Sequence, residues 1–169
     1  MKIRDYTKIA MTAAVYCVLC LTPGLNAIAF GQLQIRFAEA LTVLPVIYRN
    51  GIFGVTLGCF MSNLIGAMTG INPTGMIDSV IGTAATFLAA VCTYYFRDRR
   101  VKGIPVLSMA MPVIFNFVFI GAELAFLFMP DNFLTGFLIN GTYVAVGELI
   151  AVTIGWLIVR RLAETELFK

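Results

Sequence analysis

Six apolar stretches divide this 169-residue chain, and its lysines and arginines gather at alternate ends of them. A transmembrane helix needs about twenty apolar residues to cross roughly 30 Å of hydrocarbon. If the stretches are spans, eleven of the 12 basic residues share one face and only Arg36 lies on the other. Because lysine and arginine are enriched in cytoplasmic loops, we expect both termini in the cytoplasm. The expected spans are residues 7–21, 37–48, 52–68, 76–96, 104–128 and 134–159.

The second stretch, residues 37–48, is short for a span. It is either tilted toward a re-entrant geometry or begins in the preceding loop, and the sequence does not decide between these. With 60% apolar and 12% charged residues, the chain is an integral membrane protein, since a soluble domain carries about a quarter charged residues. The first stretch lacks a convincing signal-peptide cleavage site, so we interpret it as a retained helix. The short connections predict an all-α, compact bundle of six transmembrane helices forming one domain, residues 1–169.

Several classes of function are excluded by missing motifs. The chain has no G-x-x-x-x-G-K-[ST] phosphate-binding loop, no H-E-x-x-H, no G-x-S-x-G and no histidine, so we expect neither an ATPase nor another enzyme. Its basic residues lie at span ends rather than along a groove, which argues against nucleic acid as a partner. We expect no cofactor and no metal site. The four cysteines lie inside apolar stretches, as small membrane-helix residues do: Cys17, Cys20, Cys59 and Cys92.

Four acidic residues, Glu39, Asp78, Glu123 and Glu148, interrupt the apolar stretches. A carboxylate at the bilayer centre costs about 2.5–3.5 kcal/mol on insertion scales, so such a residue normally faces a cavity or a partner. Glu39 and Asp78 fall near the external ends of their spans, and Glu123 falls about one and a half turns before the external end of the fifth. Glu148 falls near the midplane of the sixth.

These acids have two interpretations. In the first, Arg36 and one or more of the acids form salt bridges that stabilise the bundle. One arginine, however, does not neutralise four carboxylates, and an outer cavity of negative potential favours a cationic or donor-rich ligand. Asn116 lies seven residues before Glu123, so an amide and a carboxylate share one helical face.

One segment resembles a known family. The run Gln34-Ile35-Arg36-Phe37-Ala38-Glu39-Ala40-Leu41, leading into Leu44-Pro45-Val46, resembles the signature of the queuosine-precursor transporter family, and the length and expected spans agree over the whole chain. The resemblance implies a substrate-binding (S) component of an energy-coupling factor transporter in the bacterial plasma membrane. The implied partners are a transmembrane coupling subunit and two cytoplasmic ATPase subunits, and the implied ligand is a 7-deazaguanine such as preQ1.

The resemblance also implies roles for individual residues. One carboxylate would accept the N–H donors of the guanine-like edge, and a second would pair with the aminomethyl cation. An A-x-x-x-A pattern, used in such components to dock the coupling subunit, is matched by Ala10 and Ala14 together with Ala13, although ordinary helix packing also explains it. The expected substrate-binding residues are Gln34, Arg36, Phe37, Glu39, Asn72, Asp78, Asn116, Glu123 and Glu148.

Three alternatives stay open at this point. The ligand could be another vitamin-like solute, because charge and hydrogen-bonding capacity do not name a purine. The chain could be an oligomeric proton-coupled carrier or channel in which Glu148 titrates. It could also be a structural accessory subunit whose acids are satisfied internally.

Overall fold

The computed structural model describes residues 2–29 and 36–165, and every regular element in these two ranges is a helix. An isolated antiparallel bridge joins Val101 to Ile104 in a connector. The all-α prediction is therefore confirmed. The elements are α1 Ile3–Leu21, α2 Leu25–Ala29, the 3-10 helix η1 Phe37–Val46, α3 Gly51–Met68, α4 Met76–Tyr95, α5 Val106–Phe128, the 3-10 helix η2 Pro130–Asn132 and α6 Phe133–Leu162.

Four helical segments in the described residues are long and apolar enough to cross a membrane: α3, α4, α5 and the segment Pro130–Leu162 that contains α6. They agree with the third to sixth expected spans to within a few residues. The first expected span lies inside α1, whose first two turns carry Arg4, Asp5 and Lys8, so its apolar part is shorter. The count of six spans and the orientation of the termini stay predictions.

The second expected span, residues 37–48, forms the ten-residue 3-10 helix η1. At about 2 Å rise per residue, such a helix covers roughly 20 Å, which is less than the hydrocarbon thickness. Its side chains are buried except Phe37 and Leu41, which are partly exposed. Since η1 packs against α1, α3, α4, α5 and α6, it is the central element around which the long helices are arranged.

Glycines allow the close approaches that enclose η1. A Cβ added at Gly155 of α6 would collide with the backbone carbonyl of Ala40, so α6 crosses η1 backbone to backbone. At Gly58 of α3, an added Cβ would lie 2.6 Å from the Cβ of Tyr16 in α1. The absence of a side chain at Gly58 therefore lets α1 bring the Tyr16 ring into the interior.

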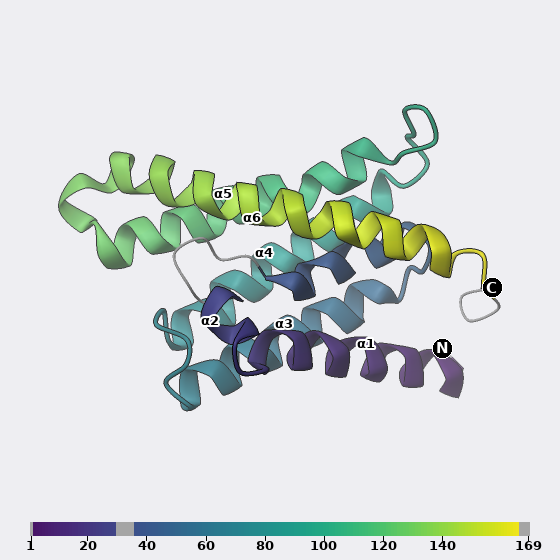
Figure 1. The fold of residues 1–169 in the computed structure, drawn as a ribbon, viewed down its shortest axis with the longest axis horizontal. Helices are drawn as coiled ribbons and strands as arrows, with labels where there is room; N and C mark the ends of the chain where they lie inside the picture. The colour runs from purple at the N-terminus through teal and green to yellow at the C-terminus, as the bar shows by residue number, and fades with distance from the viewer. Residues whose placement is uncertain (1, 30–35, 166–169) are drawn as a thin grey trace.

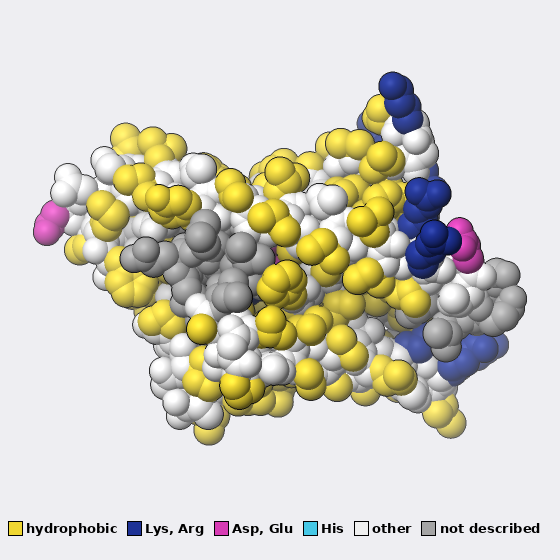
Figure 2. Space-filling view, viewed as in Figure 1, with side chains coloured by type: hydrophobic (Ala, Val, Ile, Leu, Met, Phe, Trp, Pro, Cys, Tyr) yellow, Lys and Arg dark blue, Asp and Glu magenta, His cyan; other side chains and the backbone are white. Residues whose placement is uncertain are grey.

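The start of α1 and the end of α6 lie at the same end of the molecule, and the turn between α5 and α6 lies at the opposite end (Figure 1). On the face shown in Figure 2, lysine and arginine side chains gather at the end where the chain begins and finishes. The fold thus groups the basic residues as the alternate numbering of spans predicted. Which side of the membrane this end occupies stays a prediction.

Candidate functional site

All the buried charged side chains in the described residues belong to one set: Arg36, Glu39, Asp78, Glu123 and Glu148, each at most 5% exposed. They come from the start of η1, from η1 itself and from α4, α5 and α6. The four carboxylates singled out from the sequence are thus all buried. Because burying an unpaired charge is costly, the partners of each group decide what it can do.

The carboxylate of Asp78, in the first turn of α4, is held by two residues, Arg36 and Asn72. Its Oδ2 lies 2.6 Å from Nη2 of Arg36 and accepts a 2.9 Å hydrogen bond from Nδ2 of Asn72. The Oδ1 of Asn72 in turn accepts hydrogen bonds from the backbone N–H of Thr74 at 3.1 Å and from its hydroxyl at 2.6 Å. We call Arg36, Asn72, Thr74 and Asp78 the Arg36–Asp78 network. It ties the start of η1 to the α3–α4 loop and to α4.

Glu39 of η1 is partly satisfied. Its Oε1 accepts a hydrogen bond from the Tyr16 hydroxyl of α1, and the Thr86 hydroxyl of α4 lies 3.5 Å away. Its Oε2 is buried and has no hydrogen-bond partner in the described part of the chain. One oxygen of Glu39 is therefore fixed by the fold, and the other is available.

Glu123 of α5 and Glu148 of α6 are the least satisfied acids. Neither carboxylate oxygen of Glu123, nor Oε2 of Glu148, has a hydrogen-bond partner among residues 2–29 and 36–165. The same holds for Nδ2 of Asn116, which shares a face of α5 with Glu123. Since more than about nine in ten buried polar groups in proteins are hydrogen-bonded, this concentration of unpartnered atoms indicates a place for a ligand.

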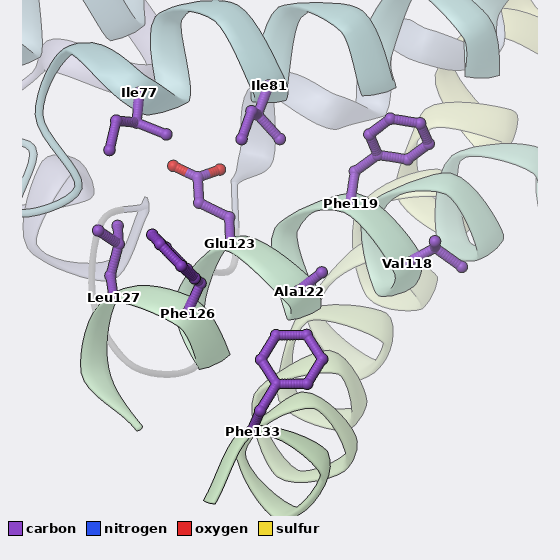
Figure 3. Close-up of a pocket in the computed structure, with 9 residues that line it drawn as sticks. All are labelled: Ile77, Ile81, Val118, Phe119, Ala122, Glu123, Phe126, Leu127 and Phe133. Atoms are coloured by element: carbon purple, nitrogen blue, oxygen red, sulfur yellow. The ribbon is translucent and has the colours of Figure 1, made fainter. Parts of the chain in front are cut away.

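A cavity of about 580 Å³ opens beside Glu123 between α4 and α5. Figure 3 shows the Glu123 carboxylate pointing from α5 toward Ile77 and Ile81 of α4, with apolar side chains around it. The volume is in the range of small-molecule sites, which are mostly apolar with a few polar groups that orient the ligand. Glu123 is the polar group of this cavity.

Arg36 is the electrostatic centre of the set. Besides its ion pair with Asp78, the Arg36 guanidinium is close enough to Glu39, Glu123 and Glu148 to attract each carboxylate electrostatically. Among the described residues, one buried cation therefore faces four buried carboxylates. When these acids are ionised, the interior has an excess of negative charge that favours a cation or a group rich in N–H donors.

The other predicted binding residues are placed differently. Phe37 is half-buried at the first position of η1. The side-chain amide of Asn72 is hydrogen-bonded to Asp78 and Thr74, so in this arrangement Asn72 positions Asp78. Gln34 lies outside the described residues. Separate elements bury Asp78, Glu39, Glu123 and Glu148, and of these Glu123 lines the cavity; that all four converge on one ligand stays a prediction.

The three alanines proposed for docking do not share one environment. Ala13 is buried, and its Cα would lie 3.1 Å from a Cβ added at Gly58 of α3. Ala10 and Ala14 are exposed on the outer face of α1. Ordinary packing thus accounts for Ala13, whereas Ala10 and Ala14 leave a small-residue surface open to another helix.

Several residues of the site were not among those expected from the sequence. Tyr16 and Thr86 contact Glu39, and Asn63 of α3 donates a 3.0 Å hydrogen bond to the backbone carbonyl of Asp78. The hydroxyls of Ser79 and Thr83 in α4 have no hydrogen-bond partner in the described residues. All five are polar residues inside apolar stretches. That property is the signal that could have found them.

Comparisons with known proteins agree over the whole chain. The model of the QueT transporter family matches residues 6–164. The chain is similar to the queuosine precursor transporter QueT of Lactococcus lactis subsp. cremoris (strain MG1363), with 27% identity over 166 residues that cover 96% of this chain and 94% of the relative. No solved structure matches the chain.

Proposed function

This chain belongs to the QueT transporter family, and we propose that it is the substrate-binding membrane subunit of an ATP-driven energy-coupling factor importer. We propose that its cargo is a queuosine precursor, a 7-deazaguanine in the form of preQ1. The similar protein from Lactococcus lactis is named a queuosine precursor transporter. Since this chain has no phosphate-binding loop, ATP hydrolysis would have to come from other subunits. A transporter family and four long apolar helical segments in the described residues support a multi-pass membrane protein that acts in transport.

The observation that carries the proposal is the pair of unpartnered oxygens on Glu123. A guanine-like edge presents two adjacent N–H donors, and one carboxylate accepts both in a bidentate arrangement. Neither oxygen of Glu123 has a hydrogen-bond partner in the described residues, and Glu123 is the acid of the set that lines the cavity, whose apolar walls suit the flat ring. We therefore assign the recognition of the ring edge to Glu123.

The aminomethyl group of preQ1 is a cation, and the remaining acids supply its counter-charge. Glu39, Glu148 and Asp78 each have an oxygen without a hydrogen-bond partner in the described residues, but the charge of Asp78 is already paired with Arg36 through its other oxygen. Asn116 has an unpartnered amide nitrogen that can donate to the carbonyl oxygen of the ring. The proposed site thus uses Glu123 and Asn116 for the ring edge and Glu39 and Glu148 for the cation.

The coupling subunit would dock on the outer face of α1. Ala10 and Ala14 lie there one turn apart, next to the exposed apolar side chains of Met11, Val15 and Val18. Small residues permit a partner helix to approach closely, and the larger apolar side chains around them add contact area. Replacing Ala14 by a bulky residue should block assembly without affecting ligand binding.

The binding part of the proposal is tested by calorimetric titration of the purified protein in detergent with preQ1 and with 7-deazaguanine, which lacks the aminomethyl cation. We expect saturable binding of preQ1 and weaker binding of 7-deazaguanine. Absence of binding to either compound by folded protein would overturn the assignment of cargo. Equal affinities would overturn the role of Glu39 and Glu148 as partners of the cation.

The transport part is tested separately in proteoliposomes. The chain alone should bind preQ1 but should not accumulate it, with or without a proton gradient. Uptake driven by a proton gradient in the absence of other subunits would instead indicate a proton-coupled carrier. This measurement distinguishes a wrong cargo from a wrong mechanism.

A further inference from the structure

A second cavity, of about 480 Å³, is lined by residues of the α4–α5 connector and of the end of α6, and none of the buried acids lines it. Ile47, which follows η1, also lines this cavity. We call it the basic cavity. The side chains that characterise it are Arg100, Lys102, Trp156, Arg160 and Glu164.

The connector that forms one wall has a defined backbone conformation. The N–H of Val101 donates to the carbonyl of Ile104 at 2.9 Å, and the N–H of Ile104 donates back at 3.0 Å. The two residues between them have positive φ, 50° at Lys102 and 82° at Gly103. Such a two-residue turn closes a tight hairpin, and a lysine is rarely found in this left-handed conformation. The turn therefore fixes the position from which Lys102 extends.

The charge on these walls is mainly positive. Arg100, Lys102 and Arg160 contribute three cations, and Glu164 contributes one carboxylate, whose 3.9 Å contact is with Arg161. None of the three cations forms an ion pair with an acidic residue that the structure describes. The three cations come from two segments and outnumber the one carboxylate of the cavity, so its net positive charge favours an anion.

An apolar groove adjoins the basic cavity and shares Arg100 with it. This groove measures about 390 Å³ and is lined by Val106, Leu107 and Ala110 at the start of α5, together with Arg99 and Val101 of the connector. Val106 and Leu107 are exposed, at 50% and 37%, on a helix apolar enough to cross a membrane. A charged cavity and an apolar groove that meet at one arginine match a molecule with a charged head and a hydrocarbon chain.

The position along the helices agrees with the headgroup region of a bilayer. Trp156 and Arg160 lie one turn apart near the end of α6, and tryptophan and arginine are typical of the membrane–water boundary. Lysine and arginine side chains gather at this end of the molecule (Figure 2). Basic pockets between transmembrane helices at this depth bind anionic lipid headgroups.

We propose that the basic cavity binds the phosphate of an anionic phospholipid such as phosphatidylglycerol, with one acyl chain in the apolar groove. Arg100 contacts the phosphate from the boundary between the two spaces, and Lys102 and Arg160 contact it from opposite walls. The adjoining groove is the reason to choose a lipid over free phosphate, because a soluble anion gains nothing from an apolar channel that faces hydrocarbon.

The first test uses the full chain in nanodiscs of phosphatidylcholine with or without one-fifth phosphatidylglycerol, followed by native mass spectrometry of lipid retained after release. We expect phosphatidylglycerol to be retained preferentially and to raise the melting temperature. Inorganic phosphate added to detergent-solubilised protein should change neither. Equal retention of the two lipids, or stabilisation by phosphate alone, would overturn the proposal.

The second test compares two triple variants with the same loss of charge. Replacing Arg100, Lys102 and Arg160 by Gln should weaken phosphatidylglycerol retention at least about tenfold, because each interfacial cation adds roughly fivefold in affinity. The control replaces Lys2, Arg4 and Arg49, which lie outside the cavity walls, and should retain the lipid. Equal losses in both would indicate general attraction to the surface and would contradict a built site.

A third variant covers the case in which the charge variant does not fold. Ala110→Phe fills the apolar groove without changing charge, and should reduce retention of long-chain phosphatidylglycerol while leaving the binding of a short-chain, dihexanoyl analogue unchanged. If Ala110→Phe retains the long-chain lipid like the unmodified protein, the acyl chain does not occupy the groove and the proposal fails.

Discussion

The Arg36–Asp78 network and the carboxylates of Glu123 and Glu148 are buried to the same degree, yet they differ in their partners. In the network, Asp78 receives a guanidinium and an amide, both within hydrogen-bonding distance. Glu123 has a cavity of about 580 Å³ beside it, and no hydrogen bond from the described residues reaches its carboxylate. Burial alone therefore does not separate a structural acid from a binding acid, whereas the count of partners does.

The difference has an energetic meaning. A buried ion pair contributes little net stability compared with apolar packing, but removing one member leaves an uncompensated charge and is strongly destabilising. A buried acid that binds a ligand is already desolvated in the free protein and makes no hydrogen bond there. Its removal should therefore lower the affinity for the ligand and leave the free energy of unfolding nearly unchanged. We use this contrast to order the following predictions.

The largest effect is expected for Asp78→Ala. This substitution removes the ion pair of the buried Arg36, so the free energy of unfolding should fall by about 3–5 kcal/mol. Thermal and denaturant unfolding in detergent would measure the change. Asp131→Ala, which removes an acid in the exposed turn η2, is the matched control and should change stability by less than about 0.5 kcal/mol. Equal stability of both variants would contradict the structural role of Asp78.

Gly155→Ala should have the next largest effect. Its added methyl group would meet the carbonyl of Ala40, so η1 and α6 must separate and the stability should fall by about 1–3 kcal/mol. The separation also moves Glu39 relative to Glu148, and preQ1 affinity should fall as well. Gly136→Ala in the same helix is the comparison, because its added Cβ would lie 2.8 Å from the Cβ of Met129 rather than 2.1 Å from a backbone carbonyl oxygen, so its effect should be smaller. The opposite order would show that the η1–α6 contact is adjustable.

Glu123→Gln tests whether an acid without hydrogen-bond partners in the protein contributes to ligand binding. The preQ1 dissociation constant should rise about 10- to 100-fold, since a charge-assisted hydrogen bond contributes about 1.5–3 kcal/mol. The free energy of unfolding should change by less than about 1 kcal/mol, because no hydrogen bond within the described residues is lost. Glu164→Gln, on an exposed acid, is the control. A large loss of stability with unchanged affinity would assign Glu123 to a structural network.

Tyr16→Phe tests Glu39, which has one hydrogen-bonded oxygen and one unpartnered oxygen and is therefore intermediate between Asp78 and Glu123. The substitution removes the hydroxyl that binds Oε1 and should cost about 1 kcal/mol of stability. Its effect on preQ1 affinity should be smaller than that of Glu123→Gln, because Oε2 is the available oxygen. Tyr143→Phe, at a 46% exposed tyrosine, should change neither quantity. A larger effect on affinity than on stability would mean that Tyr16 orients Glu39 for the ligand.

The members of the site were easier to predict than their contacts. A carboxylate inside an apolar stretch is costly, which is why Glu39, Asp78, Glu123 and Glu148 could be selected from the sequence. The sequence did not indicate which of them pairs with Arg36, since Asp78 lies 42 residues away from it and the other acids are equally plausible partners by charge. Tyr16 and Asn63 were not predicted, because their contacts with Glu39 and Asp78 depend on how α1 and α3 pack against η1 and α4.

Much of the fold was predictable where a stretch is long and apolar. The boundaries of α3, α4, α5 and α6 agree with the expected spans because hydropathy and length are local properties. The stretch 37–48 was ambiguous for the same reason. Its composition suits a span, but its twelve residues are few for one, and Phe37–Val46 within it forms a 3-10 helix that contains Pro45 and is surrounded by other helices.

The amino-acid sequence by itself determined that the chain is helical and apolar and that its basic residues lie at one end. It also determined that four acids face the protein interior rather than the lipid. These conclusions follow from transfer free energies that each residue carries regardless of its neighbours. The tertiary structure decided that η1 occupies the centre, that Arg36 pairs with Asp78 and that Glu123 keeps both oxygens available. Those outcomes depend on which helices approach each other at Gly58 and Gly155, and close approach is a property of two surfaces that neither segment encodes alone.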